Sequence, residues 1–166
     1  IHGRGGADTI SNAATAAAEN LIVMFGDSMT FTYDETTNTL SSLTTTLSGT
    51  GGDDTLSSTS GTVVMIGGAG SDTITGHSGA DIAVGDEASI TLTANKVTAI
   101  ATTGSGVGVA DTINVGDGTN VVIGGVGADL ITAGTGTNTI LGDEGRIEFN
   151  SSGTLTLAES TNASVG

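Results

Sequence analysis

The residues of this sequence that could perform chemistry are carboxylates that follow clusters of glycine. The segment Gly67–Glu87 reads GGAGSDTITGHSGADIAVGDE and contains Asp72, Asp81 and the acidic pair Asp86 and Glu87. Such carboxylates could act as a general acid and base, or as oxygen ligands of a hard cation such as Ca²⁺. Recurrence distinguishes the two chemistries, because a catalytic site need occur only once in a chain whereas a structural metal site can repeat.

The carboxylates recur with a period of nine residues. Two segments match the pattern G-G-x-G-x-D-x-U-x in full, GGAGSDTIT at 67–75 and GGVGADLIT at 124–132, and partial matches at 76–84, 115–123 and 133–141 lie in phase with them. The glycines allow a tight turn whose backbone angles strain other residues. The x-U-x part then forms a short strand with one apolar side chain pointing inward. Each nonapeptide is therefore expected to be a turn followed by a strand.

A longer unit contains these nonapeptides. A Gly-Asp motif begins at Gly26, Gly85 and Gly142, and the two full nonapeptide matches begin at Gly67 and Gly124. Both features recur at an interval of about 57 residues, and a fixed long period is the signature of a repeat architecture. We expect one repeat domain over residues 1–166, with units at about 1–50 (partial), 51–108 and 109–166.

Two nonapeptides make one coil of 18 residues, so residues 18 apart are expected to stack. Ladder one contains Asp54, Asp72, Asp111 and Asp129, with Asp8 in the equivalent position of the first copy. Ladder two contains Val63, Asp81, Asn120 and Asn138, and so has lost three of its four carboxylates. Carboxylates stacked at a strand spacing of about 4.8 Å repel one another unless a cation lies between them. Ladder one is therefore the stronger candidate for a metal.

The nonapeptides resemble the RTX (repeats-in-toxin) family of calcium-binding β-rolls, over roughly two thirds of the chain. The resemblance implies an all-β fold, a right-handed parallel β-solenoid, and type I secretion. It also implies that the metal ligands are Asp side chains and turn carbonyls: Asp8, Asp54, Asp72, Asp81, Asp111 and Asp129, with the carbonyls of Gly67, Ala69, Gly76, Gly124 and Val126. Weaker candidates are Asn120, Asn138 and the Gly-Asp residues Asp27, Asp86 and Asp143.

Each unit also contains a segment that does not follow the nonapeptide pattern. Alternating apolar residues at 90–93 and 97–100, and at 146–149 and 154–157, predict a β-hairpin about every 57 residues. Standard RTX rolls lack a hairpin at a regular interval, and a widened third coil is the alternative that the sequence leaves open. The apolar run Leu21–Phe25 is expected to be a core strand.

The composition limits the classes of partner. The chain has 166 residues, a formal net charge of −15 with only three basic residues, 28 Gly, and no Cys. Three cations cannot bind a phosphate backbone, so nucleic acid is excluded, and the absence of Cys removes disulfides. No apolar run is long enough for membrane insertion. Divalent cations are the natural counter-charge for such an acidic chain.

Catalytic interpretations are weaker than a structural one. The acidic pairs Asp86/Glu87 and Asp143/Glu144 recur once per unit, which favours a metal or capping role over an active site. The single histidines His2 and His77 lie in glycine turns and are expected to be solvated. We therefore expect no enzymatic activity from this chain.

The sequence thus predicts a calcium-stabilised, extracellular or cell-surface repeat segment of a bacterial protein, with a structural or adhesive role. Low calcium inside the cell would keep the chain open, and millimolar calcium outside would close the coils. Such a segment is expected to continue into further repeats or to self-associate, as in a filament or surface layer. The alternatives are the C-terminal secretion and folding module of a secreted enzyme or toxin, and a sugar-binding or lyase β-helix.

Overall fold

The computed structural model describes residues 1–13, 21–45, 51–104 and 108–161. These ranges contain strands and turns and no helix, so the all-β prediction is confirmed. Accordingly, none of the described residues belongs to a helix that is long and apolar enough to cross a membrane.

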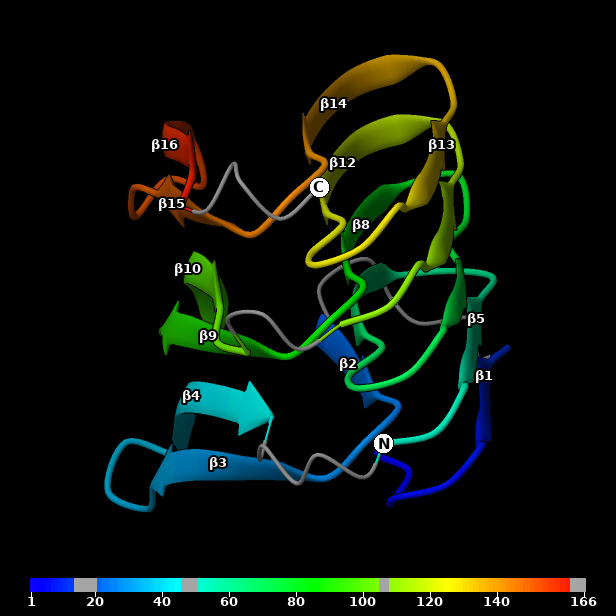
Figure 1. The fold of residues 1–166 in the computed structure, drawn as a ribbon. Coiled ribbons are helices and arrows are strands. Elements are labelled where there is room, and N and C mark those ends of the chain that lie inside the picture. The colour runs from blue at the N-terminus through cyan, green and yellow to red at the C-terminus, as the bar shows by residue number, and fades with distance from the viewer. Residues whose placement is uncertain (14–20, 46–50, 105–107, 162–166) are drawn as a thin grey trace.

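Two five-stranded sheets consist of parallel strands, as the nonapeptide pattern predicts. The first sheet contains, in spatial order, β1 (Thr9–Asn12), β5 (Thr55–Ser58), β7 (Thr73–Thr75), β11 (Thr112–Val115) and β13 (Leu130–Ala133). The second contains β2 (Leu21–Phe25), β6 (Thr62–Ile66), β8 (Ala80–Val84), β12 (Gly118–Ile123) and β14 (Gly136–Leu141). The chain alternates between these two sheets, as Figure 1 shows for β5 to β14.

A third sheet is antiparallel and has six strands. It contains, in spatial order, β3 (Met29–Asp34), β4 (Thr39–Thr45), β9 (Ala88–Thr93), β10 (Lys96–Thr102), β15 (Gly145–Phe149) and β16 (Leu155–Ser160). The consecutive pairs β3/β4, β9/β10 and β15/β16 are antiparallel, and they stack in one column beside the parallel sheets (Figure 1). The segments outside the nonapeptide pattern therefore add strands to a separate sheet.

The antiparallel pairs enter the fold at one type of position. Gly26, Gly67, Gly85 and Gly124 each follow a strand of the second sheet, and each donates its N–H to the carbonyl of the neighbouring strand's last residue at 2.9, 2.9, 3.0 and 2.8 Å, respectively. After Gly67 and Gly124 the chain returns to the first sheet through the short turns 67–72 and 124–129. After Gly26 and Gly85 it forms an antiparallel pair before it returns, through the long turns 26–54 and 85–111. The turns that lead from the second sheet back to the first are therefore alternately long and short, and each long turn contains one antiparallel pair of strands.

Two apolar cores hold the three sheets together. One core lies between the parallel sheets and includes Leu56, Ile74, Ile113 and Val122, all fully buried. The other joins the second sheet to the antiparallel sheet and includes Phe25 and Ile90, also fully buried. The prediction that Leu21–Phe25 is a core strand is confirmed, since Met24 and Phe25 at its end have no exposed surface.

Candidate metal centre

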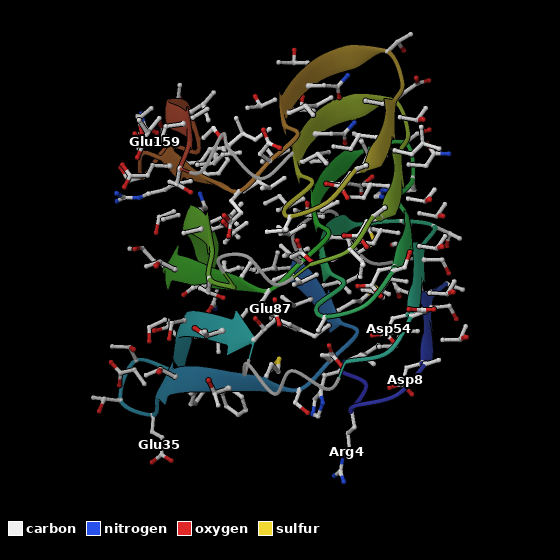
Figure 2. The ribbon with its side chains drawn as sticks, in the orientation of Figure 1. Arg4, Asp8, Glu35, Asp54, Glu87 and Glu159 are labelled. Atoms are coloured by element: carbon white, nitrogen blue, oxygen red, sulfur yellow. The ribbon has the colours of Figure 1, made fainter. Side chains whose placement is uncertain are left out.

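Ladder one forms a continuous line of hydrogen bonds along the turns. Oδ1 of Asp54, Asp72, Asp111 and Asp129 accepts the backbone N–H of Asp8, Asp54, Asp72 and Asp111, respectively, at 2.7, 2.7, 2.7 and 2.9 Å. Figure 2 shows the first two members, Asp8 and Asp54, on adjacent turns. The predicted stacking of Asp54 with Asp72 and of Asp111 with Asp129 is therefore present, and the ladder also runs without a break across the long turns.

The second oxygen differs among the ladder carboxylates, and Oδ2 of Asp8 accepts the backbone N–H of Arg4 at 2.9 Å. Oδ2 of Asp54, Asp72, Asp111 and Asp129 is buried and makes no hydrogen bond to any described residue. Each of these oxygens lies against a glycine that opens its own turn. A methyl group built on Gly67 would clash with Oδ2 of Asp72 and with the carbonyl oxygen of Gly85, and Gly26, Gly85 and Gly124 repeat this arrangement. A glycine at this position therefore leaves room beside a free carboxylate oxygen and a carbonyl oxygen.

Burial makes these carboxylates poor anions in the absence of a cation. Loss of hydration raises the pKa of Asp72 and of Asp111 to about 8, and that of Asp54 to about 6, although the backbone N–H groups that they accept lower it in part. Neighbouring carboxylates raise these pKa values further. Burial also raises the pKa of Asp129. A buried carboxylate must be neutralised by a proton or by a bound cation.

The donor set fits calcium. It offers carboxylate and carbonyl oxygens only, which are the ligands of a hard cation with flexible coordination, and no thiol or imidazole that a softer metal would need. Within the described ranges, no three His, Asp or Glu side chains converge on one point. An ion bound here would therefore draw on backbone carbonyls as well as on side chains, and the carbonyls of Gly67, Gly85 and Gly124 lie against the ladder.

Ladder two is closed by amides. Nδ2 of Asn120 donates to the carbonyl of Gly116 at 2.8 Å and to Oδ1 of Asn138 at 2.9 Å, and Nδ2 of Asn138 donates to the carbonyl of Gly134 at 3.0 Å. The amide protons thus occupy turn carbonyls that a cation would otherwise use. Val63 is fully buried in the apolar core. In ladder two, amide hydrogen bonds therefore connect Asn120 and Asn138, where ladder one has stacked carboxylates.

His77 is not the solvated loop residue that the sequence suggests. Its side chain is only 11% exposed, and Nδ1 lies 2.9 Å from Oδ1 of the fully buried Asp81, as an ion pair that is not aligned as a hydrogen bond. The backbone N–H of His77 also donates to Oδ2 of Asp81 at 2.9 Å. Burial raises the pKa of Asp81, and both contacts with His77 lower it in part. The prediction of a solvated His77 was wrong because His77 lies in the turn directly before β8, four residues before Asp81 on that strand, and its imidazole contacts the Asp81 carboxylate. Gly76, whose carbonyl is a predicted ligand, packs against the same carboxylate.

The Gly-Asp motifs contribute further buried acids. Asp27 and Asp86 are 4% and 2% exposed, and Oδ2 of each accepts a backbone N–H of the following short turn, from Ala69 at 2.8 Å and from Val126. The carbonyl of Ala69 faces Gly51. Asp143 holds the same position in the third motif and is half-buried.

Glu87 is a buried acid that belongs to one of the acidic pairs for which the sequence favours a metal or capping role. It is 2% exposed, Oε2 has no hydrogen-bond partner among the described residues, and burial raises its pKa. Figure 2 shows Glu87 between the antiparallel sheet and the parallel sheets. Glu144, at the equivalent position of the next unit, is also buried, so the repeat of this acidic position in the sequence was the available signal.

Comparison with known proteins agrees with the geometry. The family model of the RTX calcium-binding nonapeptide repeat, in four copies, matches residues 48–83 and 105–146. These segments contain both short turns and the Asp residues of ladder one from Asp54 to Asp129. No curated protein and no solved structure matches the chain. Through these repeats, the chain belongs to the RTX calcium-binding nonapeptide repeat family.

Proposed function

We propose that this chain is a calcium-dependent folding segment of an extracellular bacterial protein, with a structural or adhesive role. The observation that carries the proposal is the repeated free oxygen of ladder one, which is buried at Asp54, Asp72, Asp111 and Asp129. RTX nonapeptide repeats bind calcium ions, and proteins with these repeats are typically secreted by bacteria.

Calcium bound along ladder one would neutralise its carboxylates and join adjacent turns. The proposed ligands are Asp8, Asp54, Asp72, Asp111 and Asp129 with turn carbonyls such as those of Gly67 and Gly124, and Asp81 in the other line of turns. These oxygens come from turns that lie far apart in the unfolded chain, so no site exists before folding. Binding energy is then folding energy, and the strands close into a right-handed parallel solenoid only where calcium is abundant.

Circular dichroism during a calcium titration tests this proposal. In EGTA the strand signal is expected to be weak, and added calcium is expected to restore it cooperatively. Magnesium serves as the control, because it prefers a rigid octahedron and retains its waters. A full strand signal in EGTA that added calcium leaves unchanged would sink the proposal.

The strand edges support self-association or continuation into further repeats. Among the described strands, β13 pairs only with β11, and β14 only with β12. Leu130 on β13 and Ile140 on β14 are 63% and 44% exposed. Edge strands that are paired on one side only, and that carry exposed apolar residues, are templates for further strands. Sedimentation of the chain in calcium tests this proposal, and a persistent monomer at high concentration would count against stacking of copies.

A further inference from the structure

The long turns and the short turns differ in the residue that follows their first glycine. In the short turns, the glycine that faces the ladder is followed by a second glycine, Gly68 or Gly125. In the long turns, the equivalent glycines Gly26 and Gly85 are followed by Asp27 and Asp86. The long turns therefore carry an additional carboxylate at the point where the chain leaves for the antiparallel sheet. Asp27 and Asp86 are called the exit aspartates below.

Each exit aspartate has one oxygen in use and one oxygen free. Oδ2 of Asp27 accepts the N–H of Ala69, and Oδ2 of Asp86 accepts the N–H of Val126. Oδ1 of both residues is buried and makes no hydrogen bond within the described part of the chain. This is the same division as in ladder one, although the exit aspartates do not belong to a nonapeptide.

Glycines surround both exit carboxylates. Asp27 is flanked by Gly51 of its own long turn and by Gly68 of the following short turn, and a methyl group on either would clash with its Oδ2. Gly108 and Gly125, the equivalent residues of the next unit, do the same at Asp86, and a methyl group on Gly108 would also clash with Oδ1. The same enclosure by glycines thus occurs twice, and no ion pair of Asp27 or Asp86 with a basic side chain is present among the described residues.

A free oxygen of ladder one lies next to each exit aspartate. Oδ2 of Asp54 packs against Gly26, the residue directly before Asp27, and Oδ2 of Asp111 packs against Gly85, directly before Asp86. Each long turn therefore places two buried carboxylates close together, and one oxygen of each makes no hydrogen bond within the described part of the chain. Burial is the main cause that raises the pKa of Asp86 to about 8, and burial also raises the pKa of Asp27.

We propose that Asp27 and Asp86 are calcium ligands of a second type of site, which each shares with a ladder aspartate, Asp54 or Asp111. In the long turns the antiparallel pair interrupts the turn between Gly26 and Asp54 or between Gly85 and Asp111, and the exit carboxylate supplies an oxygen at this interruption. Because Asp27 contacts the turn of the second unit and Asp86 the turn of the third, calcium at these sites joins consecutive repeat units.

This proposal rests on the proposed function, and a count of bound calcium ions tests it. The double variant Asp27→Asn/Asp86→Asn keeps an amide oxygen that can accept the N–H of Ala69 or Val126, and it removes only the charge. Equilibrium dialysis against calcium chloride is expected to give two bound ions fewer than in the wild type. Its melting temperature in saturating calcium is expected to be lower than that of the wild type.

The matched control is Asp53→Asn/Asp117→Asn. These two exposed carboxylates also accept a backbone N–H of the next turn, from Ser71 at 2.9 Å and from Thr135 at 2.6 Å, but they are open to solvent. The control is expected to bind as many ions as the wild type.

An unchanged number of bound ions in Asp27→Asn/Asp86→Asn overturns the proposal. The exit aspartates would then serve only as hydrogen-bond acceptors for Ala69 and Val126. If the double variant does not fold in calcium, the single variant Asp86→Asn is counted instead; one bound ion fewer than in the wild type supports the proposal, and an unchanged count overturns it. A wild type that binds no calcium refutes the proposed function instead.

Discussion

At the residue scale, one glycine and one aspartate form the proposed calcium-binding pair of each turn. The glycine that opens the turn has no side chain, and the free Oδ2 of the aspartate that ends the turn lies against it. The pair occurs in the short and the long turns alike. Calcium access to the ladder should therefore depend on the absence of a side chain at Gly26, Gly67, Gly85 and Gly124.

Replacement of Gly85 by Ala tests this dependence. The added methyl group would clash with Oδ2 of Asp111 and with the carbonyl oxygen of Gly124. Overpacking of this kind destabilises a protein by about 1–3 kcal/mol, and we expect calcium affinity to fall as well. Gly142→Ala is the matched control, because a methyl group on Gly142 meets no atom within 4 Å. Equal losses of calcium affinity in the two variants would contradict the role of Gly85.

The raised pKa values predict how the metal-free protein responds to pH. Asp72, Asp86 and Asp111 have pKa values of about 8 in the folded chain, and Asp54 about 6, whereas an unfolded Asp has a pKa of about 3.9. Folding without metal therefore takes up protons. The stabilisation from protonated carboxyls is complete below about pH 4 and is lost as the pH rises to about 8.

Circular dichroism of the protein after its calcium is removed by dialysis checks this prediction. We expect a stronger strand signal at about pH 5 than at about pH 9. Calcium should reverse the trend, because it competes with protons for the same oxygens. A metal-free protein that is more stable at high pH would contradict the buried, unpaired state of these carboxylates.

Part of the site could be predicted from the sequence at this scale. The nine-residue period predicts that Asp54 stacks with Asp72 and Asp111 with Asp129, because residues 18 apart occupy the same position in successive coils. The contact of Asp72 with Asp111 spans 39 residues and a long turn, so it does not follow from this period. The contact of His77 with Asp81 could not be predicted, since it depends on turn geometry that no period encodes. The same holds for the contact of Asp27 with Ala69, 42 residues away.

At the element scale, the antiparallel pairs are part of the folded core. Ile90 on β9, Ile100 on β10 and Ile147 on β15 are fully buried, in one cluster with Val64, Val84 and Ile123 of the second parallel sheet. The long turns therefore add an apolar layer to the parallel sheets, and this layer should contribute to their stability.

Ile90→Ala measures this contribution. Removal of a buried Ile side chain costs about 2–5 kcal/mol, and the whole protein, rather than only the hairpin, is expected to become less stable in urea. Thr91→Ala, at the next and exposed position of β9, is expected to change stability by less than about 0.5 kcal/mol. If the parallel strands of Ile90→Ala unfold at the same urea concentration as those of the wild type, the antiparallel sheet folds separately.

The sequence predicts the elements unequally. A turn of glycines followed by x-U-x can only be a short strand in a stacked coil, so the parallel strands follow directly from the pattern. The alternation around Ile90 and Leu92 fits a hairpin and a widened coil equally well, because both bury every second residue. Which sheet receives those strands depends on contacts with Leu43 and Phe25, which lie in another repeat unit.

At the scale of the whole molecule, the acidic composition is linked to the fold through the position of the carboxylates. A chain with 18 acidic and three basic residues places five of its carboxylates in one line across both short and both long turns. We expect this line to oppose folding when no cation is bound and to join adjacent turns when calcium is bound. The proposed function therefore predicts that folding depends on the calcium concentration.

Thermal unfolding of the wild type and of two double variants, each at a low and at a saturating calcium concentration, tests the central claim most directly. We predict that the higher calcium concentration raises the melting temperature of the wild type and of Asn120→Ala/Asn138→Ala. Much of the rise should be lost in Asp72→Asn/Asp129→Asn, because each occupied site adds about 2.7 kcal/mol when calcium is a hundredfold above its Kd. An equal calcium-induced rise in the two double variants, or no rise in the wild type, would contradict the claim that ladder one holds the calcium that stabilises this fold.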